Sequence, residues 1–435
     1  MGLTPLLVGV IGIIALLCLL FTGISVGIAM AIVGFTGFIY LMGFTPAFGL
    51  LMTVPYSTVA NYSMSVVPLF ILMGQFAYHS GISEDLFKTT NKWLGHLPGG
   101  LSMASIGASA GFAAICGSSA ATTATMGAVA LPEMEKMKYN KGFSAACLAA
   151  GGTLGILIPP STGFILYGVV SEQSIGKLFI AGIIPGIILA SMYMLTIYFI
   201  ARRRPELAPA GAKANWKERI YSLKSTWGML VLFIGIMGGI IFGVFTANEA
   251  GAMGAFGSFL FLVGKGKFNR HNIIKSLTET MNTTAMVFLI LVGAYIFSYF
   301  LTLSTLPQAM ATFLSTLPVS PYIIIIGILM IYLILGCIMD SLSMIVITTP
   351  IFLPVIMKLG FDPIWYGVMM VVAMEQGQIT PPVGLNLYVI TGVAKDIPMH
   401  TVFRHITPFV ITLVIFMFLL IAFPNLALFL PGLMK

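Results

Sequence analysis

Two segments combine consecutive prolines with hydroxyl and amide side chains inside otherwise apolar sequence. Residues 151–163 read GGTLGILIPPSTG, and residues 375–386 read EQGQITPPVGLN. Proline lacks a backbone N–H and ends a helix, so each pair leaves carbonyl groups that must find other partners in lipid. Both segments therefore predict a membrane helix that is broken where its carbonyl oxygens can bind a ligand.

Each broken helix follows a segment of small and polar residues, CGSSAATTAT at 116–125 and GCIMDSLSM at 336–344. Carbonyl and hydroxyl oxygens suit a small hard cation such as Na⁺, and the N-termini of half-helices suit an anionic substrate. We therefore predict at least two Na⁺ ions and no organic cofactor. The first Na⁺ site would comprise Gly117, Ser118, Ser119, Gly155, Ile158 and Pro160. The second would comprise Gly336, Asp340, Gly377, Thr380 and Val383, and the substrate site Thr153, Ser161, Thr162 and Asn386.

Asp340 and Glu375 are the acidic residues deepest in the apolar sequence. A carboxylate inside a membrane is a functional candidate by default, as a cation ligand or a proton carrier. A carboxyl group that caps a broken helix end is the alternative, and it stays open here. The run 120–125 also has a second interpretation, close helix packing. No Lys or Arg falls inside the proposed site, so helix dipoles, hydroxyls and bound cations would hold a carboxylated substrate.

The composition places these motifs in a membrane protein. Of 435 residues, 58% are hydrophobic and 8% are charged, which excludes a water-soluble globular protein. Lys and Arg lie in short clusters between apolar runs, so the net charge of +8 reflects membrane topology rather than nucleic-acid binding. The four cysteines have no metal-ligand spacing. The first basic residue is Lys88, so we expect no cleaved signal peptide.

The two Pro-Pro pairs belong to an internal repeat. The shift in residue number that superposes Pro159 on Pro381 also aligns Gly155 with Gly377, without a gap. The predicted domains are a first repeat at 1–203, a basic cytoplasmic linker with an amphipathic helix at 204–224, and a second repeat at 225–435. Each repeat contains a re-entrant hairpin (99–135 and 320–358) and a broken helix (142–170 and 363–394).

Charge sets the predicted orientation. The basic segments all face the cytoplasm only if both hairpins enter and leave on one side of the membrane. The chain is then an all-α polytopic protein with about ten transmembrane helices, two re-entrant hairpins and both termini in the periplasm. Five crossings separate the hairpins, so the second repeat is inverted relative to the first. Inverted repeats with discontinuous helices are typical of secondary transporters.

An ordered set of motifs resembles one known family. PLFILMG (68–74), GSSAATTATMGAVALPEM (117–134), GTLGILIPPS (152–161) and ITPPVGLNLYVI (379–390) are similar to the large membrane subunit of tripartite ATP-independent periplasmic (TRAP) transporters, the DctM type of the ion transporter superfamily. The resemblance runs from about residue 60 to the C-terminus.

The resemblance implies Na⁺-coupled symport of an organic acid across the bacterial inner membrane. The substrate would be a C4-dicarboxylate, sialic acid or a similar carboxylate, moved by an elevator motion of a transport domain against a scaffold. It also implies two partners, a small DctQ-like membrane subunit and an extracytoplasmic solute-binding protein.

Two other functions compete with this one. An intramembrane protease using Asp340 and Glu375 would need a second aspartate motif or a HExxH metal motif, and the sequence has neither, so we expect no enzyme activity. A stand-alone ion-coupled organic anion carrier or cation antiporter, which needs no binding protein, stays open as the alternative.

Overall fold

The computed structural model describes residues 3–434, and all regular structure in this range is helical, as the sequence predicts. The predicted domain limits at residues 1 and 435 lie outside the described residues. The helices of the first half are α1 (Pro5–Phe21), α2 (Val26–Met42), α3 (Phe44–Val59), η1 (Tyr62–Ser65), α4 (Val66–His79), α5 (Ile82–Leu94), α6 (Gly100–Cys116), α7 (Ser119–Lys136), α8 (Lys141–Gly152), α9 (Leu154–Leu157), α10 (Thr162–Ser171) and α11 (Ile175–Arg203). Those of the second half are α12 (Trp216–Ile241), α13 (Ala247–Gly264), α14 (Arg270–Leu303), α15 (Leu306–Thr316), α16 (Pro321–Gly336), α17 (Ser341–Lys358), α18 (Pro363–Ile379), α19 (Leu385–Val393), α20 (Met399–Ala422), α21 (Asn425–Leu428) and η2 (Pro431–Leu433).

Several helices are long and apolar enough to cross a membrane. Within the described residues these are α11, α12, α14, α17 and α20, or up to seven spans if the two bent pairs, at 44–79 and 141–171, are each one span. Four shorter apolar helices, α1, α2, α6 and α16, have 16 or 17 residues. The protein is therefore an integral membrane protein, while the number of ten crossings stays a prediction.

The predicted hairpins and breaks coincide with helix boundaries. Helices α6 and α7 meet at Gly117 and Ser118, and α16 and α17 meet across residues 337–340. The first broken helix stops at Leu157 and restarts as α10, and the second stops at Ile379 and restarts as α19. Both Pro-Pro peptide bonds, which are cis, lie in these breaks. Proline thus ends each helix where the sequence predicts.

Helix boundaries also follow the sequence repeat. Helices α7 and α8 begin at Ser119 and Lys141, and the shift that superposes the Pro-Pro pairs carries these positions onto the first residues of α17 and α18. One pair of counterparts differs, because α3, η1 and α4 form a bent unit whereas α14 is one helix of 34 residues. The bent unit contains Pro55 and Asn61, whereas α14 has no proline. The inverted relation of the two halves stays a prediction.

The linker lies over the base of the first hairpin. Its backbone is bonded on both sides of that hairpin, since Gly99 N donates to Ala208 O at 3.1 Å and Asn140 N donates to Leu207 O at 3.0 Å. The helix expected at the end of the linker begins at Trp216, and it continues without a break to Ile241 as α12. No glycine or proline occurs in residues 216–227, so nothing in the sequence ends the helix at the linker boundary.

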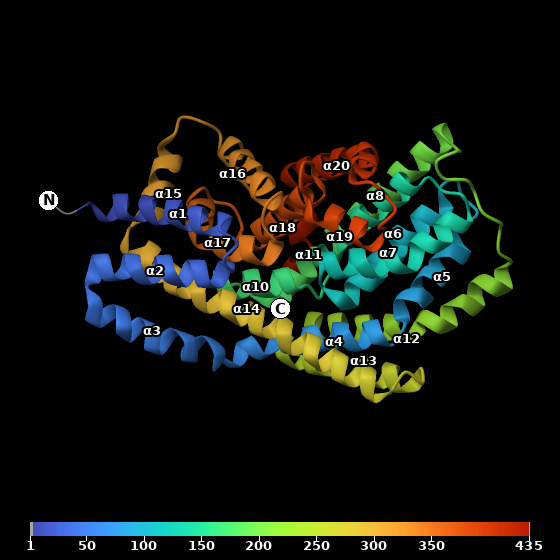
Figure 1. Ribbon diagram of the computed structural model, residues 1–435, viewed down its shortest axis with the longest axis horizontal. Helices are drawn as coiled ribbons and strands as arrows, with labels where there is room; N and C mark the ends of the chain where they lie inside the picture. The colour runs from blue at the N-terminus through green and yellow to red at the C-terminus, as the bar shows by residue number, and fades with distance from the viewer. Residues whose placement is uncertain (1–2, 435) are drawn as a thin grey trace.

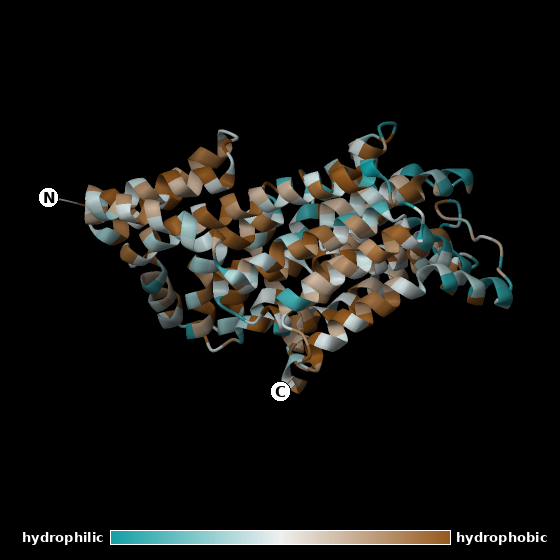
Figure 2. Ribbon diagram, turned by 90° about the horizontal axis from the view of Figure 1, so that it is seen from below, coloured by the Kyte–Doolittle hydropathy of each residue, from teal (hydrophilic) through white to brown (hydrophobic). Residues whose placement is uncertain are grey.

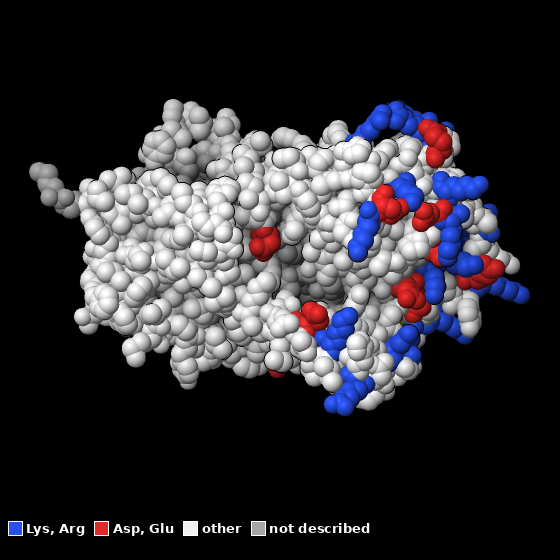
Figure 3. Space-filling view, in the orientation of Figure 1, with Lys and Arg blue, Asp and Glu red and all other residues white. Residues whose placement is uncertain are grey.

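The molecule is elongated, and its charge is concentrated at one end. Helices α1, α2, α3 and α15 lie at one end of the long axis, α5 and the start of α12 lie at the other, and the hairpins and broken helices lie between them (Figure 1). Hydrophilic residues concentrate at the end that carries α5 (Figure 2). Lys and Arg gather there as well, on the face seen in Figure 3. We refer to this end as the basic end.

Glycines set the crossing of α2 with α14. A Cβ atom on Gly293 would overlap the carbonyl oxygen of Gly27, and one on Gly27 would lie 2.5 Å from the carbonyl oxygen of Leu289. The two backbones are therefore in direct contact, as is typical of membrane helices that cross at small residues.

This crossing predicts opposite effects of alanine at two glycines. Gly293→Ala would force α2 and α14 apart and lower the free energy of unfolding by about 1–3 kcal/mol. Gly327→Ala is the matched control, because a Cβ on Gly327 in α16 meets nothing within 4 Å. Alanine at that position gains helix propensity and should leave stability equal or higher. Melting in detergent tests this, and an unchanged melting temperature for Gly293→Ala would contradict the crossing.

Candidate functional site

The first hairpin tip packs directly on the first helix break. Gly117 has a φ of +64°, which favours glycine, and its carbonyl oxygen accepts hydrogen bonds from Thr162 N at 3.2 Å and Thr162 Oγ1 at 2.7 Å. A Cβ on Gly117 would lie 2.7 Å from the carbonyl oxygen of Pro160, and one on Gly155 would lie 2.5 Å from that of Ser118. Four members of the first predicted Na⁺ site are therefore neighbours.

The second tip packs on the second break in the same way. A Cβ on Gly377 would lie 2.6 Å from Cα of Gly336, so the ends of α16 and α18 touch through their backbones. Cys337 Sγ lies 3.7 Å from the carbonyl oxygen of Thr380 and 3.3 Å from that of Leu333, and Thr380 Oγ1 donates to Gln376 O at 2.6 Å. Three residues of the second predicted set, Gly336, Gly377 and Thr380, are thus brought together.

Asp340 lies at the start of α17 as its N-cap. Its carboxylate accepts from Ser343 N at 3.0 Å and also from Ser343 Oγ. This is the capping geometry that the sequence left as an alternative. Whether the same carboxylate also binds a cation stays a prediction, as does the contribution of Val383.

Of the predicted substrate ligands, three already have partners in the protein. Thr153 Oγ1 lies 2.6 Å from Ala150 O and 3.1 Å from the Tyr193 hydroxyl. Ser161 caps α10, and the Thr162 hydroxyl is bonded to the first hairpin tip. Asn386, at the start of α19, is fully buried, and neither atom of its amide has a hydrogen-bond partner within the described residues. Asn386 is therefore the predicted residue most available to a ligand.

A buried polar cluster on α18 lies outside the predicted ligand sets. Glu375 is 1% exposed, accepts a hydrogen bond from Ser341 Oγ at 3.1 Å through Oε1, and has no protein partner for Oε2 within the described chain. The Oε1 atoms of Gln376 and Gln378 are likewise buried and unpartnered there. The signal in the sequence was EQGQ, three long polar residues in an apolar helix, of which only Glu375 was singled out. Buried polar groups without partners are rare and require an explanation.

The site is shared between the two halves of the chain. Helix α10 packs on α17, and α19 packs on α7 and α8. The approach is close, since a Cβ on Gly127 of α7 would lie 2.7 Å from the δ-methyl of Ile390 in α19. Each half-helix that follows a break therefore touches the hairpin of the other half.

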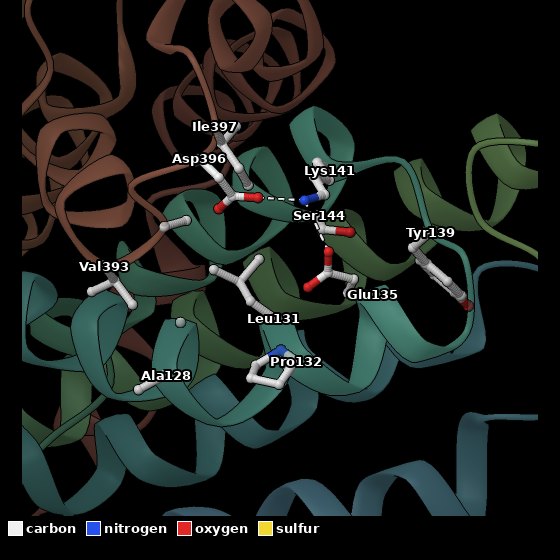
Figure 4. A pocket seen from close by; sticks show the side chains of 12 residues that line it. Ala128, Leu131, Pro132, Glu135, Tyr139, Lys141, Ser144, Val393, Asp396 and Ile397 are labelled. Carbon is white, nitrogen blue, oxygen red and sulfur yellow. Dashed lines mark hydrogen bonds and ion pairs between the residues drawn. The ribbon is translucent and has the colours of Figure 1, made fainter.

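Two cavities flank α7 toward the basic end. One, of about 350 Å³, lies between α7, α8 and the end of α19, and Lys141 at its rim bonds to Glu135 at 2.9 Å and to Asp396 (Figure 4). The hydrogen bond from Lys141 lowers the pKa of Asp396. The other cavity, of about 690 Å³, lies between α7 and α5 and includes Thr125, Lys88 and Lys267. Both cavities are lined by residues of α7, the helix that begins at the first hairpin tip.

The central donor set fits an alkali cation better than a transition metal. Among residues 3–434 no group of three His, Cys, Asp or Glu side chains is placed to hold a metal ion. The oxygens that meet at the tips and breaks are carbonyls, hydroxyls and amides, together with the Glu375 carboxylate. Hard oxygen ligands with little net charge suit hard, weakly charged cations, whereas Zn²⁺ and Cu²⁺ favour nitrogen and sulfur.

Comparison with known proteins agrees with the family resemblance. The chain matches the family described as "Tripartite ATP-independent periplasmic transporter, DctM component" over residues 13–426. The C4-dicarboxylate TRAP transporter large permease protein DctM of Pseudomonas aeruginosa is 37% identical over 379 residues, covering 87% of this chain and 88% of that protein. The sialic acid TRAP transporter large permease protein SiaM of Vibrio cholerae is 35% identical, covering 86% of this chain and 87% of that protein.

Two further matches concern other substrates and the fold. The 2,3-diketo-L-gulonate TRAP transporter large permease protein YiaN of Escherichia coli is 34% identical, covering 82% of this chain and 85% of that protein. The crystal structure of the YdaH transporter of Alcanivorax borkumensis superposes with a TM-score of 0.61 at 16% identity, over 88% of this chain and 90% of that one, which is a likeness of fold alone.

The family match spans nearly the whole chain, and the DctM, SiaM and YiaN relatives are transporter permeases rather than enzymes. This chain therefore belongs to the DctM family, the large permease component of tripartite ATP-independent periplasmic transporters.

Proposed function

We propose that the protein carries out Na⁺-coupled uptake of an organic acid across the bacterial inner membrane. In this proposal an extracytoplasmic solute-binding protein delivers the substrate, and a small DctQ-like subunit completes the membrane part. Most of the relatives with a named substrate are named for a carboxylate, such as a C4-dicarboxylate, sialic acid or 2,3-diketo-L-gulonate, whereas one is named for isethionate, a sulfonate. The substrate of this chain would be a carboxylate of the same kind.

The observation that carries the proposal is the meeting of two hairpin tips with two helix breaks beside buried, unpartnered polar groups. Discontinuous helices of secondary transporters form substrate and ion sites in this way. Asn386 is placed to donate to a carboxylate, and α19 begins after Gly384 with no side-chain cap, so its first N–H groups are available to an anion.

Electrostatics supports coupling between cation and substrate. None of the ion pairs of the described residues lies at the tips and breaks. An anionic substrate would meet the carboxyl group of Glu375 without a basic side chain to offset it. Cations bound by the carbonyl groups of the tips and breaks would supply the missing positive charge, so substrate and Na⁺ should bind together.

The arrangement of elements supports an elevator with alternating access. The hairpins and broken helices pack together in the middle of the molecule and would form the moving domain (Figure 1). Helices α2, α4, α13 and α14 pack on one another and would form the scaffold. The basic end would face the cytoplasm and both termini the periplasm, in accord with the positive-inside rule.

Reconstitution tests the function. Proteoliposomes that contain this protein, the small subunit and the binding protein should accumulate a C4-dicarboxylate or sialic acid only under an inward Na⁺ gradient. Omitting either partner should reduce uptake to background. Full uptake by this chain alone would instead support the alternative of a stand-alone carrier. Uptake that does not depend on Na⁺ would contradict the proposed Na⁺ coupling.

The second cation site predicts a specific loss at Thr380. Thr380→Val keeps the shape of the side chain but removes an oxygen beside Gly377, so the Na⁺ concentration for half-maximal uptake should rise by about tenfold. Thr391→Val is the matched control, because that hydroxyl bonds only within α19, to Leu387 O at 2.9 Å and Tyr388 O at 3.1 Å. Equal Na⁺ dependence of the two variants would rule out a site at Thr380.

Topology predicts which residues a membrane-impermeant thiol reagent can reach. In a background that lacks the four natural cysteines, Lys213→Cys in the linker should react only from the cytoplasmic side. Lys177→Cys, at the exposed start of α11, should react only from the periplasm. Labelling of Lys213→Cys in intact cells would overturn the orientation.

A further inference from the structure

Glu375 lies where the first residues of both hairpin return helices converge. Ser341, the first residue of α17, donates from Oγ to Glu375 Oε1 at 3.1 Å. Ser119, the first residue of α7, places its hydroxyl beside the same carboxyl group. Gln378, one turn along α18 from Glu375, donates to Ser341 Oγ. One carboxyl group thus connects the two tips, which come from opposite halves of the chain.

Several buried oxygen atoms around this carboxyl group have no hydrogen-bond donor from the protein. Glu375 Oε2, Gln378 Oε1 and Ser119 Oγ are buried without a hydrogen-bond partner in the described residues. Glu375 is absent from every ion pair found in residues 3–434. An ionised carboxylate at 1% exposure with one hydrogen bond is costly unless a positive charge compensates it.

We propose that Glu375 Oε2, Gln378 Oε1 and Ser119 Oγ bind a Na⁺ ion at a third site between the two tips. This site takes the hydroxyl of Ser119, which the sequence placed in the first Na⁺ set, and leaves that first site to the remaining members of its set. This inference rests on the proposed function, since it adds one ion to the coupled transport. The site differs in chemistry from the other two, because all of its proposed ligands are side-chain oxygens. A single carboxylate with neutral oxygens favours a monovalent ion over Ca²⁺, which takes six to eight oxygen ligands.

The position of the site has a mechanical consequence. An ion held by Glu375 and Ser119, with Ser341 already bonded to the same carboxyl group, holds the start of α7 and the start of α17 against α18. Loss of the ion would leave the Glu375 carboxylate uncompensated between the two tips. Occupancy therefore keeps both hairpins closed together, and release loosens both.

Purified protein and proteoliposomes provide two independent readouts. In the wild type, NaCl should raise the melting temperature relative to KCl, and the number of Na⁺ ions moved per substrate can be obtained from reversal potentials. Glu375→Gln keeps the side-chain shape but removes the charge. It should shrink the Na⁺-induced melting shift and lower the number of Na⁺ ions per substrate by one. Glu206→Gln in the exposed linker is the control and should change neither quantity.

A second variant covers the case in which Glu375→Gln does not fold. Ser119→Ala removes one ligand and no charge, and it should raise the Na⁺ concentration needed for the melting shift by about tenfold. Unchanged stoichiometry and an unchanged melting shift in Glu375→Gln would overturn the site. The site would also be overturned if Glu375→Gln kept the full Na⁺ stoichiometry but its uptake no longer depended on pH. Glu375 would then carry a proton rather than bind Na⁺. Failure of the proposed function is distinct, because the wild type would then show no Na⁺-dependent uptake at all.

Discussion

Every carbonyl group that a proline pair frees inside an apolar bundle needs another partner, and this requirement organises the centre of the molecule. The first helix stops at Leu157 and restarts at Thr162, and the hairpin tip at Gly117 fills the space between them. Because Thr162 bonds to that tip through both its backbone and its hydroxyl, break and tip form one unit. Neither would be stable in lipid alone, since unpaired backbone groups are costly there.

Close backbone approach then determines which residues can lie at the centre. Gly155 and Gly377 have no room for a Cβ atom, because the hairpins touch the broken helices through main-chain atoms. Such contacts bring the start of each hairpin return helix beside α18 or the first break. The predicted ligand sites of carbonyl oxygens depend on this packing, since the same close approach that excludes side chains gathers main-chain oxygens.

The polar groups that the fold leaves without hydrogen-bond partners are the best candidates for binding a ligand. Thr153, Ser161 and Thr162 use their hydroxyls to hold the breaks in shape. Asn386 and Glu375 keep buried atoms with no protein partner in the described chain, so these two residues are the ones we propose for substrate and cation. The distinction between structural and available polar groups lies in a few hydrogen bonds, and residue type alone does not reveal it.

The sequence by itself determined the class of protein, the helix breaks and the family, because composition, proline and ordered motifs act locally or are read directly from the chain. The constant shift between the two Pro-Pro pairs likewise predicted matching helix boundaries in the two halves. Only the tertiary structure decided that Asp340 caps α17 and that Glu375 lies between the two tips. The surroundings of Glu375 depend on contacts between opposite halves of the chain. A local sequence pattern does not show which side chain of a distant helix will form a hydrogen bond with this carboxyl group. For Asp340 the pattern allowed a cation ligand, a proton carrier or a helix cap. The observed hydrogen bonds establish the cap, and binding of a cation stays a prediction.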